Sequence, residues 1–98
     1  MMLKTVKIVL IVDNEEHCQK CEAMKNMIDL IIMAFQGKLV LLVKELHWEE
    51  REAISLGDKY NLFEIPACII GNNSFCGEDY SYDSIINAIE CTEDKDVQ

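Results

Sequence analysis

The fold is decided by the stretch Cys18-Gln19-Lys20-Cys21, which lies between an apolar run and a helical pattern. On a helix, positions i and i+3 share a face with Cβ atoms about 5–6 Å apart, so two cysteines at this spacing can close a disulfide with little movement. Cys18 stands at the helix start, where unpaired N–H groups and the helix dipole favour a thiolate. The pattern is typical of a reversible dithiol. Half of a metal site and a pair of structural thiols are the alternatives.

The residues on either side of this pair predict a strand followed by a long helix. Val6 to Val12 is almost continuously apolar and rich in β-branched residues, which is typical of a strand buried on both faces. Asp13 to His17 is a polar connection. From Cys18 onward, apolar residues recur at three- and four-residue steps until Gly37 supplies a stop signal, which predicts an amphipathic helix. The apolar stripe consists of Cys21, Met24, Ile28, Ile31 and Phe35, widened by Met27 and Ile32.

The remaining sequence predicts further strands and helices. Lys38 to Leu46 has the apolar run of a second buried strand, and Trp48 to Tyr60 is predicted to be a helix. Ala67 to Cys76 predicts two strands joined as an antiparallel hairpin, and Ser81 to Cys91 predicts the last helix. A strand, a helix and a strand without a hairpin turn form a right-handed unit whose two strands are parallel.

The order β-α-β-α-β-β-α predicts an α/β fold with a four-stranded mixed sheet flanked by helices on both faces. We expect residues 1–98 to form a single domain, with residues 92–98 as a frayed tail. The candidate core positions of the second helix are Trp48, Ala53, Ile54 and Leu56. The methionines at positions 24, 27 and 33 are predicted to fill gaps in the core.

Composition and charge limit the compartment and the partners. Half of the residues are hydrophobic, which is typical of a globular chain, and no apolar run approaches the roughly 20 residues of a membrane span. The N-terminus lacks the pattern of a secretory signal, so we expect a cytoplasmic protein. A formal net charge of −9 argues against nucleic acid and anionic membranes as partners, because both need a cationic surface.

Two further segments carry a resemblance to a known family. The element order, with a Cys-x-x-Cys sequence opening the first helix, resembles the thioredoxin fold. Lys59 to Ala67 is similar to the thioredoxin segment in which Lys-Tyr, an aliphatic residue and Ile-Pro-Thr precede a strand, and Pro66 is the only proline in the sequence. The resemblance implies a cis peptide bond before Pro66, with Ile65 and Pro66 facing the dithiol and the extended chain of a substrate.

A third segment, Cys76-Gly77-Glu78-Asp79, resembles the glycine-containing turn after the fourth strand of thioredoxins and glutaredoxins. It implies that Gly77 also faces the substrate. Other positions depart from the family. Gln19-Lys20 replaces the Gly-Pro of thioredoxins and the Pro-Tyr of glutaredoxins, and His17 stands where thioredoxins usually have Trp. Val12 occupies the position of the buried thioredoxin acid, with Asp13 beside it, so the subfamily stays open.

The resemblance and the helix position together assign roles to the two cysteines. Cys18 is predicted to be the attacking thiolate, and Cys21, one turn into the helix, the resolving thiol that breaks the mixed disulfide. His17 and Lys20 are predicted to favour the thiolate of Cys18. The other cysteines lack the spacing of a disulfide scaffold. We expect Cys68 and Cys91 to be small buried hydrophobic residues, and Cys76 to end a strand beside the site.

The sequence therefore predicts an enzyme, a thiol-disulfide oxidoreductase that reduces or exchanges protein disulfides. We expect a monomer with no bound cofactor or metal. Its expected partners are protein disulfide substrates and an electron donor, which is a reductase or a small thiol. One alternative is a glutaredoxin-type reductase that uses glutathione or another small thiol. The other is a non-enzymatic module whose dithiol senses redox state or holds a metal, together with Cys68, Cys76 or His17.

Overall fold

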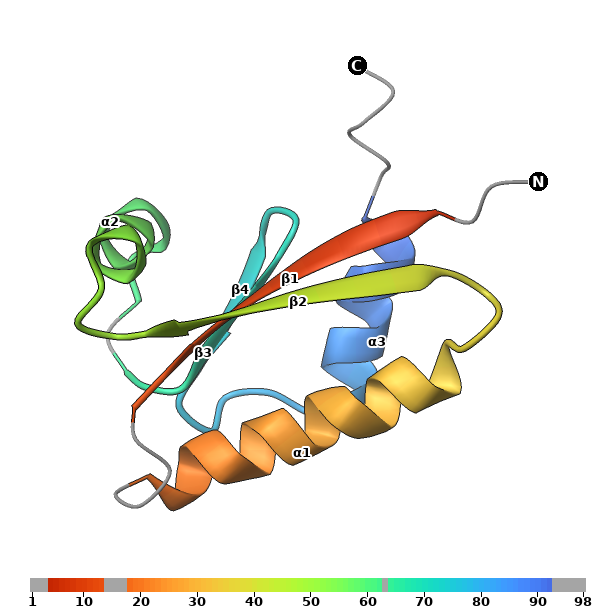
Figure 1. Ribbon diagram of the computed structural model, residues 1–98, viewed down its shortest axis with the longest axis horizontal. Coiled ribbons are helices and arrows are strands. Elements are labelled where there is room, and N and C mark those ends of the chain that lie inside the picture. The colour runs from red at the N-terminus through yellow and green to blue at the C-terminus, as the bar shows by residue number, and fades with distance from the viewer. Residues whose placement is uncertain (1–3, 14–17, 63, 93–98) are drawn as a thin grey trace.

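The computed structural model describes residues 4–13, 18–62 and 64–92. Within these residues the elements follow the order β-α-β-α-β-β-α, which confirms the predicted order (Figure 1). The elements are β1 (Thr5–Val12), α1 (Gln19–Ala34), β2 (Val40–His47), α2 (Arg51–Tyr60), β3 (Ala67–Ile70), β4 (Asn73–Cys76) and α3 (Tyr82–Cys91).

The four strands form one mixed sheet in the order β2-β1-β3-β4. β1 pairs in parallel with β2, from Thr5 opposite Val40 to Val12 opposite His47. β1 pairs antiparallel with β3, and β3 pairs antiparallel with β4. α1 and α3 lie on one face of the sheet, and α2 lies on the other (Figure 1). This arrangement confirms the predicted four-stranded mixed sheet with helices on both faces.

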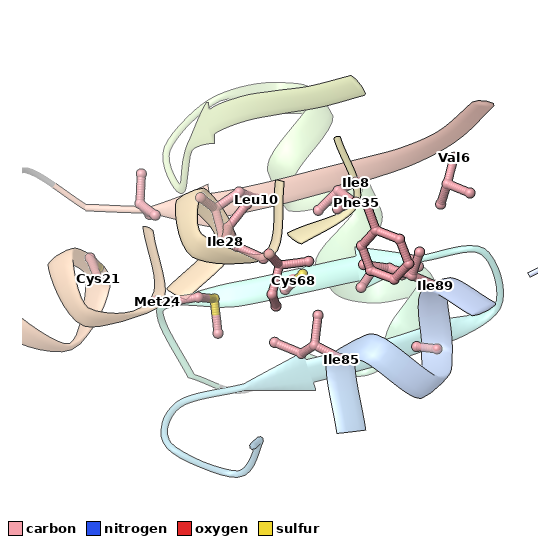
Figure 2. Close-up of a cluster of buried hydrophobic side chains, with 14 residues drawn as sticks. Val6, Ile8, Leu10, Cys21, Met24, Ile28, Phe35, Cys68, Ile85 and Ile89 are labelled. Atoms are coloured by element: carbon pink, nitrogen blue, oxygen red, sulfur yellow. The ribbon is translucent and has the colours of Figure 1, made fainter. Parts of the chain in front are cut away.

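β1 contributes side chains to two hydrophobic clusters on opposite faces of the sheet, because successive residues of a strand point to opposite faces. Val6, Ile8, Leu10 and Val12 belong to the main core between the sheet, α1 and α3. Ile11 belongs to a smaller cluster under α2. Figure 2 shows the main core, to which the other elements contribute Met24, Ile28, Cys68, Ile85 and Ile89.

The prediction of β2 as a buried strand is wrong. β2 lies at the edge of the sheet, and Val40, Leu42 and Val43 are exposed, whereas Leu46 near its end is buried. α2 covers only the end of the sheet where β2 terminates (Figure 1). An apolar run predicts a strand but does not say whether that strand becomes central or lies at the edge.

The predicted start of the second helix also needs correction. The structure has β2 continuing to His47, because the N–H of Trp48 still donates to the carbonyl of Val12 at 2.9 Å, and α2 starts only at Arg51. Trp48 therefore lies in a turn and is 44% exposed, and Ile54 is 54% exposed. Neither is a core residue. Met33, on the outer side of α1, is likewise exposed and not part of the core.

None of the helices in the described part of the chain combines the length and the apolar character that crossing a membrane requires.

Candidate dithiol site

Cys18 caps the N-terminus of α1. Its backbone is extended, and its Sγ accepts the N–H of Cys21 at 3.1 Å, while its carbonyl accepts the N–H of Glu22 at 3.3 Å. The first N–H groups of a helix have no partner within the helix, so a side chain at this position supplies one. The sulfur of Cys18 therefore sits where a hydrogen bond and the helix dipole both favour negative charge on it.

Cys18 and Cys21 are joined by a disulfide, with their Cα atoms 5.2 Å apart. The two sulfurs differ in environment: Cys21 is fully buried in the main core, whereas Cys18 is half-buried at its edge. The backbone N–H of Asp13 also points at the Sγ of Cys21, at 3.4 Å. An incoming thiol thus meets Cys18 first. Cys21, as the departing sulfur, receives a hydrogen bond that stabilises its thiolate.

The contact between Asp13, which lies beside Cys21, and His47 was not predicted from the sequence. Asp13 follows β1 and His47 ends β2, and the His47 Nε2 lies 3.3 Å from Asp13 Oδ1. The ring is oriented by the N–H of Glu49, which donates to His47 Nδ1 at 3.3 Å. The parallel pairing of Val12 with His47 brings these two strand ends together. The predicted parallel pairing of the two strands was the sequence signal for this contact, because the ends of neighbouring parallel strands lie side by side.

The residues predicted to face the substrate lie next to one another. The Ile65–Pro66 peptide bond is cis, Pro66 is fully buried, and its carbonyl accepts the N–H of Gly77 at 2.8 Å. Gly77 has a φ of +64°, and a Cβ there would collide with the carboxylate of Glu64. Ile65 is half-buried and packs against both clusters, including the core against which Cys18 also packs.

Of the two residues predicted to favour the thiolate of Cys18, the structure describes only Lys20. Lys20 is exposed, and its Nζ lies 3.1 Å from Glu78 Oε1, so its ammonium is directed at a carboxylate. Such an exposed pair contributes little to stability. The pair of Lys20 and Glu78 flanks a groove beside the dithiol. This groove has a volume of about 480 Å³, and its walls include Met27 and Tyr80. Burial, together with Glu78 and Cys68, raises the pKa of Tyr80. His17 lies outside the described residues.

The three remaining cysteines lie in three environments. Cys68 is buried in the main core, as expected, and burial raises the pKa of its thiol to about 12. Cys76 is half-buried and packs in the cluster under α2, on the face opposite α1. Cys91, expected to be buried, is exposed as the last residue of α3. Among the residues that the structure describes, no three His, Cys, Asp or Glu side chains gather as a metal site would require.

Solved structures similar to this chain include thioredoxins and a thioredoxin-like protein. An uncharacterised thioredoxin-like protein from Clostridium perfringens aligns with a TM-score of 0.69 at 18% identity, over 95% of this chain and 75% of that chain. Thioredoxin 1 from Thermosipho africanus aligns with a TM-score of 0.58 at 24% identity, over 86% of this chain and 90% of that one. Chloroplastic thioredoxin z aligns with a TM-score of 0.59 at 15% identity, over 89% of this chain and 77% of that chain.

No protein-family model matches the sequence, and no curated protein matches it significantly. At these identities, the structural likeness establishes the thioredoxin-like fold.

Proposed function

We propose that this chain, which has the thioredoxin-like fold, is a thiol-disulfide oxidoreductase that reduces or exchanges protein disulfides through Cys18 and Cys21. The observation that supports this function is the disulfide at the start of α1, with one half-buried and one fully buried sulfur. A reaction in two steps needs this asymmetry, because one sulfur must meet the substrate while the other stays protected until the mixed disulfide has formed.

In the reduced protein, the thiolate of Cys18 attacks one sulfur of the substrate disulfide, and the other substrate sulfur leaves as a thiolate. Cys21 then loses its proton and attacks the Cys18 sulfur of the mixed disulfide. This step forms the Cys18–Cys21 disulfide and releases the second substrate sulfur. The substrate gains two electrons and two protons, which the dithiol loses. A thiol donor, either a dithiol reductase or a small thiol, reverses these steps and restores the dithiol.

Backbone N–H groups around the two cysteines favour the thiolate that each step requires. The Cys21 N–H and the α1 N-terminus favour the thiolate of Cys18, and the Asp13 N–H favours the thiolate of Cys21 when Cys21 is the leaving group. Ile65, Pro66 and Gly77 form the proposed wall against which the substrate chain lies.

A glutaredoxin-type reaction is the second candidate, favoured by the groove flanked by Lys20 and Glu78. Its volume of about 480 Å³ lies within the roughly 300–1,000 Å³ typical of small-molecule sites, so it could hold a small peptide thiol. The two candidates differ in their donor. Glutathione alone should support turnover in the second and give little turnover in the first, where a dithiol donor is required.

Turnover of insulin disulfides by the purified protein, with dithiothreitol as donor, tests the proposal. We expect Cys18→Ser and Cys21→Ser each to abolish catalysis, because the cycle needs both sulfurs. Cys91→Ser removes an exposed thiol outside the site and should leave the rate unchanged. Turnover that persists in Cys18→Ser would contradict the role of Cys18. A wild-type protein that is inactive with every donor and holds zinc or iron tightly would contradict the proposed function.

A further inference from the structure

β2 leaves one of its two backbone edges unpaired. It is the outermost strand of the sheet, and among the described residues only β1 pairs with it. The N–H of Val40 donates to the carbonyl of Lys4, which precedes β1, at 2.8 Å. Because the backbone groups of successive residues in a strand alternate in direction, the N–H and C=O groups of Leu41, Val43 and Glu45 point away from β1. These groups can pair with an added strand.

Beside this edge, the face of the sheet opposite α1 is apolar and open. Val40, Leu42 and Lys44 share this face with Leu46, which packs in the cluster under α2. Leu42 is 50% exposed, and Val40 is also exposed, because α2 covers only the end of the sheet where β2 terminates (Figure 1). A groove of about 230 Å³ lies here, and Val9 and Leu42 line it. Exposed apolar side chains beside an unpaired strand edge mark an interaction surface.

This surface carries positive charge, although the whole chain has a formal net charge of −9. Residues 4–12 and 38–47, which comprise β1, β2 and the residues directly before them, contain four lysines and a single glutamate. The lysines are Lys4, Lys7, Lys38 and Lys44. Lys7 and Lys44 line the groove itself. Nearly half of the nine basic residues of the chain therefore lie on or beside these two strands.

Neighbouring carboxylates offset this charge only in part. Glu52 Oε1 of α2 lies 2.9 Å from Lys44 Nζ, and Glu45 Oε1 lies 3.3 Å from Lys25 Nζ. The pair of Lys44 and Glu52 is exposed, so it contributes little to stability, and a carboxylate from a partner can replace Glu52. At physiological ionic strength the Debye length is about 8 Å, so more distant acidic residues are largely screened from the groove.

These features fit an extended acidic peptide better than a second copy of this chain. A peptide strand can bond to the outward N–H and C=O groups, place apolar side chains on Val40 and Leu42, and direct carboxylates to Lys7 and Lys44. Two copies paired edge to edge would bring lysines of both copies together. Residues 93–98 of this chain are acidic but include a lysine and only one apolar residue, so they match the surface less well.

We propose that the outer edge of β2 is a docking site for an extended acidic segment of a partner protein, which adds a fifth strand to the four-stranded sheet. The segment lies along Val40 to Lys44, which pair with the first half of β1, whereas the dithiol follows the other end of β1 (Figure 1). A docked partner therefore leaves Cys18 accessible. Docking requires no thiol chemistry, so this inference goes beyond the proposed function and stands independently of it.

The test uses the capped peptide Glu-Thr-Val-Thr-Val-Thr-Glu, in which both valines and both glutamates lie on one side of an extended chain. It is titrated into the ¹⁵N-labelled protein and followed by NMR. We expect the largest shifts in β2, and slower exchange of the outward amide protons of Leu41, Val43 and Glu45. The amide proton of Leu42, which faces β1, should change less. Shifts centred on another surface, or no binding at about 1 mM peptide, would overturn the inference.

Matched variants test the apolar contact. Leu42→Gln should weaken binding of the peptide about tenfold, which matches the contribution of one apolar side chain at an interface. Leu30→Gln makes the same change on α1, where Leu30 is 59% exposed, and should leave the affinity unchanged. Equal effects of the two substitutions would contradict the proposed surface.

The charge contact has its own control. Lys7→Gln/Lys44→Gln should weaken binding several-fold, whereas Lys20→Gln/Lys59→Gln removes the same charge elsewhere and should weaken it less. A peptide with glutamine in place of both glutamates should bind more weakly than the acidic peptide and should respond little to Lys7→Gln/Lys44→Gln. Equal effects of the two double variants on the acidic peptide would contradict the assigned charges.

N-methylated peptides test the strand pairing without changing the protein. Methyl groups are placed on the backbone nitrogens of the two valines in one peptide and of the first two threonines in another. In a bound strand, only alternate N–H groups face β2, so one of the two peptides should lose binding and the other should retain it. Equal binding by both peptides, or loss of binding by both, would contradict the added strand.

Three results would assign the edge to another occupant and overturn the inference. The first is a dimer, seen by analytical ultracentrifugation, in which the same amides are protected without peptide. The second is protection of these amides in the monomer that disappears when residues 93–98 are deleted. The third is binding to phosphatidylserine vesicles that depends on Lys7 and Lys44, together with no binding of the peptide.

Discussion

Cys18 and Cys21 lie one helical turn apart, yet their sulfurs have different tasks because their surroundings differ. Cys18 is a helix cap whose Sγ accepts an N–H, and Cys21 is enclosed by the main core. The other cysteine of that core, Cys68, has no role in the proposed chemistry. Its thiol has a pKa raised to about 12 by burial. Because only a thiolate attacks a disulfide, Cys68 is inert at neutral pH and does not compete with the dithiol.

The raised pKa of Cys68 predicts a loss of stability at alkaline pH. The unfolded thiol ionises near its ordinary value of 9.0, whereas the folded thiol keeps its proton until about 12. Its contribution is therefore fully present below pH 9.0 and is lost as the pH rises toward 12, with a slope of up to about 1.4 kcal/mol per pH unit. Urea unfolding of the wild type and of Cys68→Ala, between about pH 8 and about pH 11, measures this slope.

Other groups also titrate in that range, so the difference between the two proteins is the relevant quantity. Cys91→Ala removes an exposed thiol and should keep the wild-type slope. An identical slope in Cys68→Ala and the wild type would contradict the assigned environment of Cys68.

At the scale of the element, α1 carries the dithiol on a helix that the core holds in place. Cys21, Met24, Ile28 and Ile31 are its buried residues, one every three or four positions. These residues form one apolar face, which buries Cys21 and packs α1 against the sheet. On the outer side of this helix, Leu30 and Met33 are exposed at 59% and 67%.

Two methionines of α1 provide a matched pair for testing that anchor. Met24→Ala empties a fully buried position and should lower the free energy of unfolding by about 2–5 kcal/mol. Met33→Ala makes the same chemical change at a position that is 67% exposed and should alter it by less than about 0.5 kcal/mol. Urea denaturation followed by circular dichroism gives both values. Equal losses in the two variants would show that α1 is oriented differently.

At the scale of the whole molecule, one end of the sheet gathers the parts of the proposed site. The ends of β1 and β2, the start of α1 and the loops on either side of the hairpin meet there (Figure 1). Local signals, namely the period of each element and the Cys18–Cys21 spacing, predicted the elements and the dithiol, whereas the approach of Pro66 to the dithiol was implied only by the resemblance to thioredoxins. Local patterns predict the elements because backbone and packing preferences act over a few residues.

The features that the sequence did not predict depend on contacts between distant segments. The apolar run of β2 is the same whether the strand is central or at the edge, and only the sheet order places it at the edge. The contact of Asp13 with His47 requires the parallel register of two strands. The ion pair of Lys20 with Glu78 requires the turn after β4 to approach α1. The exposure of Trp48 follows from where β2 stops.

Trapping of the mixed disulfide tests the central claim most directly. Purified Cys21→Ser, with Cys91 also replaced by Ser, is incubated with insulin or a peptide disulfide, and the adduct is located by intact-mass and peptide-mapping mass spectrometry. We predict a stable adduct on Cys18, because the resolving sulfur is missing, and no adduct in the corresponding Cys18→Ser protein. An adduct located on Cys76 or Cys68, or equal adduct formation in both variants, would contradict the assignment of Cys18 as the nucleophile.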